Sequence, residues 1–139
     1  WSGALSPADY RRYSLPWSRR VFKALERSGV PAIHFGTGTA GFLKDFASAG
    51  GAAVGVDWRV DLKTAWGQIG HNKSIQGNLD PAIVATASTD DLRRETRAVM
   101  ASVSGQKGHI FNLGHGVLPS TPPDSVGRVV DWVHEWSAR

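Results

Sequence analysis

Short apolar segments alternate with amphipathic helical segments along this sequence, and that alternation restricts the possible folds more than any other feature. The predicted strands cover residues 31–35, 52–58, 74–78 and 109–113, and each one precedes a helix or a helical turn. Strands and helices that alternate at this spacing form βαβ units around a parallel sheet. The second strand is almost continuously apolar, which is typical of a strand covered on both faces. The sequence therefore predicts an α/β fold.

Capping residues and apolar stripes predict the helices. The first helix begins after Ser6 and runs towards Ser28, and Pro16 is expected to kink or split it because proline lacks an amide donor. In the last helix, valines over residues 126–133 recur at i, i+3, i+4 and i+7 and predict a buried stripe. The other predicted helices cover residues 42–49, 62–69 and 88–104, and the last helix begins at Thr121.

Two parallel architectures fit this order of elements. One is an open, doubly wound sheet that is complete in itself, and the other is half of an eight-stranded barrel, a fold that typically needs about 250 residues. The chain has 139 residues, with no internal repeat and no linker that divides it, so residues 1–139 are predicted to form a single domain or part of one. In the barrel case the outer strands need another segment beside them, because unpaired strand edges promote aggregation.

Composition narrows the possible partners. The absence of cysteine excludes disulfides and thiolate metal sites and is consistent with a cytoplasmic protein. No apolar stretch approaches the ~20 residues that a membrane helix needs, and the first residues lack the pattern of a signal peptide. The net charge of +4 favours an anionic partner, either a nucleic acid or a small molecule with several carboxylates. The basic residues between Arg11 and Arg27 predict a solvated helix face.

The segment GTGTAG contains a full G-x-G-x-x-G pattern at Gly36, Gly38 and Gly41. It follows a predicted strand and precedes a helix, and Asp57 lies near the position of the acidic residue that contacts ribose in dinucleotide-binding folds. A Rossmann-like dinucleotide-binding domain is therefore one alternative. Glycine-rich turns are also common in other parallel α/β proteins, and the long helix that comes first here is unusual for a dinucleotide fold.

The segment NLGHG, which follows the last predicted strand, is the stronger functional candidate. Active-site residues collect at this end of the strands in α/β folds, and glycines on both sides of His115 are expected to let the backbone turn sharply and leave space around the ring. Such a histidine can transfer a proton or donate a hydrogen bond to a carboxylate.

His34 is predicted to be a core residue instead, and no residue spacing predicts a metal site. The tryptophans are expected to pack in the protein, so no nucleic-acid partner is predicted.

Four segments together resemble the uroporphyrinogen decarboxylase family. The longest is GHIFNLGHGVLPSTPPDSVGRVVDWVHEW, residues 108–136, and the others are GALSPADY at 3–10, GVDWRVDL at 55–62 and IQGNLDP at 75–81. They occur in the family's order and span essentially the whole chain, and NLGHG followed by a proline pair is specific to the family. The resemblance implies a single (β/α)₈ TIM barrel, of which this chain supplies the C-terminal half, about strands five to eight.

The resemblance also implies an activity and its partners. The family removes the carboxyl groups of the four acetate side chains of uroporphyrinogen III and yields coproporphyrinogen III in haem biosynthesis. The implied carboxy-lyase uses no cofactor and no metal and works as a homodimer in the cytoplasm. The substrate carries eight carboxylates, which agrees with the basic charge balance of this chain. The implied partners are uroporphyrinogen and the missing N-terminal half of the same barrel.

Only one functional residue of the family maps onto this sequence. The family's active-site histidine corresponds to His115, which is expected to bind substrate. The family's N-terminal arginine stretch, its aspartate and its tyrosine belong to the half that is absent, and its serine falls immediately before Trp1. The catalytic residues are thus unknown within this chain, and the isolated chain is predicted to be inactive.

Overall fold

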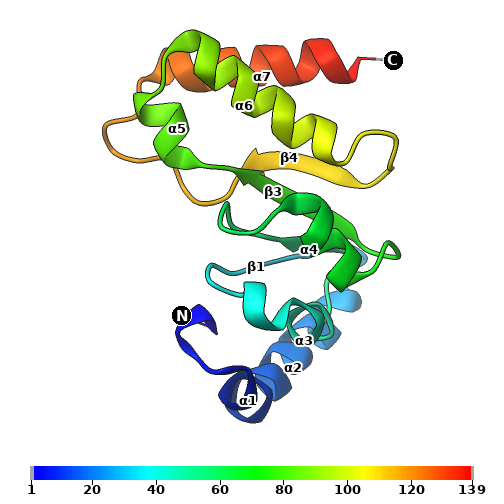
Figure 1. Ribbon diagram of the computed structural model, residues 1–139. Coiled ribbons are helices and arrows are strands. Elements are labelled where there is room, and N and C mark those ends of the chain that lie inside the picture. The colour runs from blue at the N-terminus through cyan, green and yellow to red at the C-terminus, as the bar shows by residue number, and fades with distance from the viewer. Residues whose placement is uncertain (1, 139) are drawn as a thin grey trace.

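A computed structural model describes residues 2–138 and contains one parallel sheet. Its strands lie in the same order in space as along the chain, with β1 paired to β2, β2 to β3, and β3 to β4 (Figure 1). The strands are β1 (Ile33–Phe35), β2 (Ala53–Gly55), β3 (Ser74–Leu79) and β4 (His109–Leu113). The predicted α/β fold with a parallel sheet is confirmed.

Helices lie between the strands and before the first of them. The chain begins with the short turns η1 (Ser2–Ala4), α1 (Pro7–Asp9) and η2 (Tyr10–Ser14), followed by α2 (Leu15–Glu26). The remaining helices are η3 (Ala40–Phe42), α3 (Leu43–Ala47), α4 (Leu62–Ile69), α5 (Pro81–Thr86), α6 (Thr89–Ser102) and α7 (Pro123–Ser137). Figure 1 shows them stacked along the sheet, with α1 to α3 at the end near β1 and α5 to α7 at the end near β4.

The order of the strands distinguishes between the two architectures that the sequence left open. A doubly wound sheet reverses its strand order at a switch point and carries helices on both faces. Here the order runs from β1 to β4 without reversal, as it does around a TIM barrel. Ile33, Phe35 and Ile110 remain 46%, 45% and 42% exposed, whereas Val54 and Ile75 pack into the helical layer. The sheet is therefore of the barrel type, with helices on one face and an uncovered apolar face opposite.

Pro16 divides the first helix as predicted. Residues 10–14 form a π-helical turn in which the Leu15 amide donates to the Tyr10 carbonyl, and α2 begins at Leu15 with the proline in its first turn. A π turn arises where the regular ladder of i to i−4 hydrogen bonds is disturbed, and proline both lacks the amide and crowds the preceding turn. Ser6 caps α1 by accepting a hydrogen bond from the Asp9 amide.

Some of the predicted boundaries were wrong. The strand expected over 52–58 ends at Gly55, because the chain then leaves β1 and turns into the loop that carries Asp57. The helix α5 was not predicted, although Asp80 caps it and Pro81 occupies its first position. The last helix begins at Pro123, without a side-chain cap. Its valine stripe is narrower than predicted because Val130 is 45% exposed.

His34 is a core residue, as predicted. Its ring lies between Phe22 and Phe46, with ring centroids 4.6 and 3.6 Å away, and its Nδ1 lies 3.2 Å from the Phe46 carbonyl oxygen. Burial lowers the pKa of His34 to about 4, and the nearby charge of Lys73 acts in the same direction. The histidine is thus neutral in the folded protein at neutral pH and donates from Nδ1.

We expect this histidine to make the folded state sensitive to mild acid. Between pH 6.5 and 4 the unfolded chain binds a proton that folded His34 does not, so stability falls as the pH falls through this window. Partial solvation of the ring reduces the expected loss in the free energy of unfolding to about 2 kcal/mol. Urea unfolding at pH 7 and pH 4.5 measures this loss, and His34→Phe should reduce it. Burial also lowers the pKa of His109, so the stability of the His34→Phe variant should still fall somewhat as the pH falls. An equal pH dependence in both proteins contradicts the assignment.

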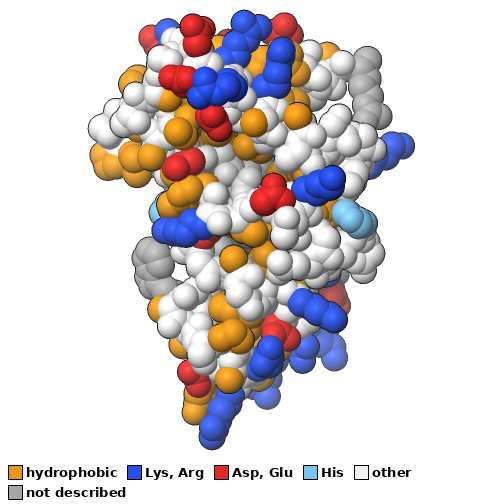
Figure 2. All heavy atoms as spheres, viewed as in Figure 1, with side chains coloured by type: hydrophobic (Ala, Val, Ile, Leu, Met, Phe, Trp, Pro, Cys, Tyr) orange, Lys and Arg blue, Asp and Glu red, His pale blue; other side chains and the backbone are white. Residues whose placement is uncertain are grey.

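The basic helix face is solvated, as predicted. All six basic side chains between Arg11 and Arg27 are exposed, and Figure 2 shows Lys and Arg side chains gathered at the end of the molecule formed by α1 to α3. Arg11 pairs with Asp45 at 2.7 Å, and Arg19 donates to Ser48. This face therefore joins η2 and α2 to α3 and the residue that follows it through polar contacts at the surface.

Candidate functional site at the carboxyl end of the sheet

The segments that follow all four strands contribute to one hollow of about 340 Å³, which we call the carboxyl-end hollow. Thr37 comes from the turn after β1, Trp58 and Arg59 follow β2, Asp80 follows β3, and His115 follows β4. In barrel folds the carboxyl ends of the strands carry the active site. The structure therefore places His115 in the expected region, among residues from three other segments.

His115 is oriented by its own loop. The Gly116 amide donates to His115 Nδ1 at 2.8 Å, so that nitrogen has no proton and Nε2 carries it in the neutral ring. The ring lies nearly perpendicular to the Trp58 indole, with ring centroids 6.2 Å apart and planes at 84°. The side chain is exposed, and its Nε2–H is available to donate to an oxygen anion. This geometry suits recognition of a carboxylate.

The glycines beside His115 act differently from the prediction. The chain bends at Gly114 and His115 as expected, but neither Gly114 nor Gly116 has a positive φ, so the bend does not depend on a conformation that favours glycine. At Gly114 a Cβ atom would lie 2.3 Å from the Trp58 amide nitrogen, whereas nothing lies within 4 Å of such an atom at Gly116. Gly114 is required for a close approach of two backbones, and that approach brings His115 next to Trp58.

Asp57 is the structural centre of the site. Its carboxylate is 3% exposed and accepts hydrogen bonds from the Gly38 amide, the Arg59 amide and Arg59 Nη1. The Asn78 amide group donates to the carbonyls of Asp57 and Val60 at 2.9 and 2.7 Å. These contacts connect the turn after β1, the loop after β2 and the end of β3. Sequence reasoning identified Asp57 only as a ribose ligand and missed its role in joining the loops.

The same contacts contradict the dinucleotide alternative. Asp57 is 3% exposed, so a ribose cannot reach its carboxylate, and the Gly38 amide donates to Asp57 and is not free for a pyrophosphate. The third glycine of the fingerprint normally permits close packing of helix and strand, yet nothing lies within 4 Å of a Cβ built at Gly41. The Gly38 turn is also covered by Gly3, where a Cβ would lie 2.0 Å from the Thr37 carbonyl oxygen. The glycine turn thus has a structural role, because it connects β1 to the loop after β2 through Asp57. The Gly38 amide is therefore not free for substrate carboxylates either.

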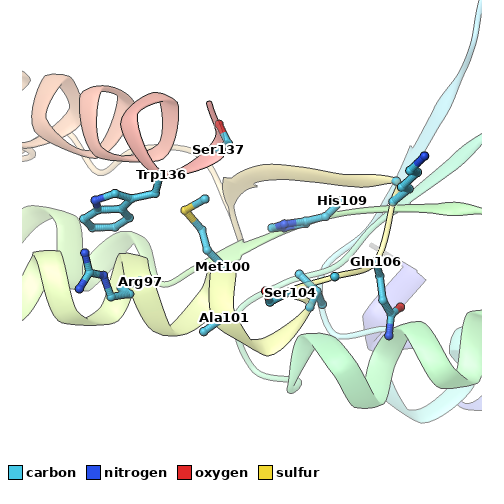
Figure 3. Close-up of a pocket in the computed structure, with 12 residues that line it drawn as sticks. Arg97, Met100, Ala101, Ser104, Gln106, His109, Trp136 and Ser137 are labelled. Carbon is cyan, nitrogen blue, oxygen red and sulfur yellow. The ribbon is translucent and has the colours of Figure 1, made fainter. Parts of the chain in front are cut away.

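A larger hollow of about 690 Å³ lies at the opposite, amino end of β4. Figure 3 shows Arg97 beneath the Trp136 indole, with its guanidinium carbon 4.5 Å from the ring centroid, and Met100 and His109 beside them. His109 Nε2 lies 2.8 Å from the Gly77 carbonyl oxygen. This amino-end hollow is remote from the segments that meet at His115. Its size alone does not make it the active site, because barrel chemistry takes place at the other end.

Trp66, Trp132 and Trp136 have packing roles, as predicted, whereas Trp17 is 61% exposed and Trp1 lies outside the described residues. Trp66 is buried and its indole donates to the Lys73 carbonyl at 2.8 Å. Trp132 and Trp136 stack on each other along α7, with ring planes 5° apart.

Across residues 2–138 no group of three or more His, Asp or Glu side chains is placed to hold a metal ion. Within the same residues, no helix has the length and apolarity that crossing a membrane demands.

Comparison with solved structures agrees with the barrel-type fold. A methyltransferase from Methanosarcina mazei superposes with a TM-score of 0.80 over 96% of this chain and 39% of its own length. The two sequences are 19% identical, so the match concerns the fold alone.

Comparison of sequences identifies the family. The model of the uroporphyrinogen decarboxylase family matches residues 1–136. The chain belongs to the uroporphyrinogen decarboxylase family. The resemblance drawn from NLGHG, GVDWRVDL and IQGNLDP is thereby confirmed.

Individual uroporphyrinogen decarboxylases match the chain along its length. The protein from Streptomyces coelicolor is 52% identical over 139 residues, which are all of this chain and 39% of that protein. The relative from Sorangium cellulosum is 47% identical over 134 residues, or 96% of this chain and 38% of its own length. The chain therefore spans about two fifths of the length of these relatives.

Proposed function

We propose that this chain forms about strands five to eight of a uroporphyrinogen decarboxylase barrel and contributes His115 to its substrate site. The assembled enzyme removes the carboxyl groups of the four acetate side chains of uroporphyrinogen III and yields coproporphyrinogen III. The observation that carries the proposal is the placement of His115 beyond the carboxyl end of β4, where it lines a hollow together with Arg59 and where the Gly116 contact with Nδ1 leaves Nε2–H as the donor of the neutral ring. Both groups suit an anionic substrate.

The chemistry requires little covalent participation by the protein. Loss of CO₂ leaves a carbanion-like carbon, and the protonated pyrrole of the substrate accepts the electron pair before the carbon is protonated. The protein then supplies orientation and electrostatic stabilisation. His115 holds a carboxylate near the reacting group through its Nε2–H. No cofactor enters this scheme.

The uncovered face of the sheet supports the need for a companion segment. Ile33 and Phe35 at one edge and Ile110 at the other expose apolar surface that lies inside a closed barrel. Trp17 and Val21 on α2 are exposed as well. We propose that the N-terminal half of the barrel covers these residues. The homodimer and the cytoplasmic location stay predictions.

Reconstitution tests the proposal. We expect the purified chain to release no coproporphyrinogen from uroporphyrinogen III, because the other family site residues lie outside it. Adding the part of the Streptomyces coelicolor relative that lies outside the 139-residue match should restore turnover. Chromatography of the products after anaerobic incubation measures the turnover of the chain alone and that of the mixture. Turnover by the chain alone contradicts the proposed division of the site, and an inactive but stably assembled mixture contradicts the proposed function.

A further inference from the structure

Arg59 has hydrogen-bond donors that the protein does not use. Its Nη1 lies 2.9 Å from the Asp57 carboxylate, and the side chain is 55% exposed. Within residues 2–138, Nε and Nη2 of this guanidinium make no hydrogen bond. A guanidinium carries five N–H groups in a planar fork, so one edge of Arg59 remains available to a second carboxylate.

The guanidinium is held in place although it is exposed. Its carbon lies 4.0 Å from the centroid of the Trp58 ring, and its Asp57 partner is buried and fixed by the Gly38 amide. An arginine that is already ordered loses less conformational freedom when it binds a ligand than a freely rotating one does. The contacts of Asp57 therefore prepare Arg59 for binding.

Arg59 and His115 both pack against the Trp58 indole. The Arg59 guanidinium lies over the Trp58 ring, and the His115 ring lies nearly perpendicular to the indole at a centroid distance of 6.2 Å. Both side chains line the carboxyl-end hollow. Asp80, the acidic residue that also lines it, accepts a hydrogen bond from the Ala82 amide as the cap of α5. The hollow thus offers two separate donors to oxygen anions.

We propose that Arg59 binds a carboxylate side chain of the substrate through Nε and Nη2, while His115 binds another carboxylate through Nε2. Trp58 and Asp57 are positioning residues that keep the two donors apart at a fixed spacing. The ligand class is a ring-shaped molecule with several carboxylate arms. This inference rests on the proposed function and adds a binding residue that sequence reasoning did not identify.

The test is steady-state kinetics on the reconstituted enzyme with uroporphyrinogen III. Arg59→Gln should raise KM about tenfold or more, with a much smaller change in kcat, because a charge-assisted contact to a non-reacting arm is lost. The KM of the unmodified enzyme should rise with NaCl concentration, and that of the variant should rise less steeply. Arg94→Gln is the matched control, because Arg94 is an exposed, paired arginine on α6, outside the hollow.

A second variant covers the case in which Arg59→Gln fails to fold because Asp57 loses a partner. Arg59→Lys retains a cation for Asp57 but lacks the planar fork, so its KM should also rise. If the reconstituted enzyme is active and a folded variant of Arg59 keeps the KM and the salt response of the unmodified enzyme, the inference is overturned while the proposed function stands. If the unmodified enzyme assembles but does not turn over uroporphyrinogen, the proposed function fails and this inference fails with it.

Discussion

Replacing Gly114 with alanine is expected to lower the free energy of unfolding by about 3 kcal/mol, the largest stability effect that we predict for a single methyl group. The added Cβ would lie 2.3 Å from the Trp58 amide nitrogen and 3.0 Å from the Asp57 carbonyl carbon. Both are backbone atoms, which a rotamer change cannot move. The Gly114 amide also donates to the Leu79 carbonyl at 2.8 Å, which fixes the loop against β3. The whole segment that follows β4 must therefore shift to accommodate the added methyl group.

Gly116→Ala is the matched control for this prediction. It adds the same methyl group two residues away, where nothing lies within 4 Å and φ is not positive. We expect its effect to stay within about 0.5 kcal/mol. Urea unfolding of the two variants and the unmodified chain, followed by circular dichroism, gives the comparison. Equal midpoints for the two variants would show that the close approach of the backbones at Gly114 does not exist.

Replacing His115 with alanine should reduce kcat/KM for uroporphyrinogen III about a hundredfold or more in the reconstituted enzyme. The substitution removes the Nε2–H donor of a side chain that lines the hollow and whose Nδ1 accepts from the Gly116 amide. His115 is exposed and lies 6.2 Å from the Trp58 ring between centroids, so the variant should fold and assemble normally. The loss should therefore appear in turnover and not in stability.

His134→Ala is the control for the catalytic effect. His134 is exposed on α7 and belongs to neither hollow. Its removal should leave kcat/KM within about twofold of the unmodified value, which is the range we expect for a remote surface substitution. A His115→Ala enzyme with unchanged turnover would show that the residue only shapes the loop.

The sequence predicted the order of the elements and the position of His115 because both depend on local signals. Apolar runs mark the four strands, and Ser6 and Ser88 cap their helices as predicted. The helix α5 was missed, although the Asp80–Pro81 pair is a standard helix start, because six residues are too few to show a helical repeat of apolar positions.

The contacts that build the site could not be predicted from local patterns. The bond from Gly38 to Asp57 spans 19 residues, and the bond from Asn78 to Asp57 spans 21. They depend on β1, β2 and β3 being neighbours, which in turn depends on the strand order that the sequence left open. The segment GVDWR contains Arg59, but the sequence does not show that this arginine lies close to His115. That proximity follows only from the structure, in which Trp58, Arg59 and His115 line the same hollow.

Two histidines allow the central claim, that substrate binds at the carboxyl end around His115, to be tested in one experiment. His115 lines the carboxyl-end hollow and His109 lines the amino-end hollow. The chain is labelled at the carbon atoms of its histidine rings and assembled with the unlabelled companion segment. This assembly is titrated with uroporphyrin, the oxidised form of the substrate, and the histidine resonances are followed by NMR. We predict that the ring resonance of His115 shifts while that of His109 stays in place. A shift at His109 with His115 unmoved would contradict the account.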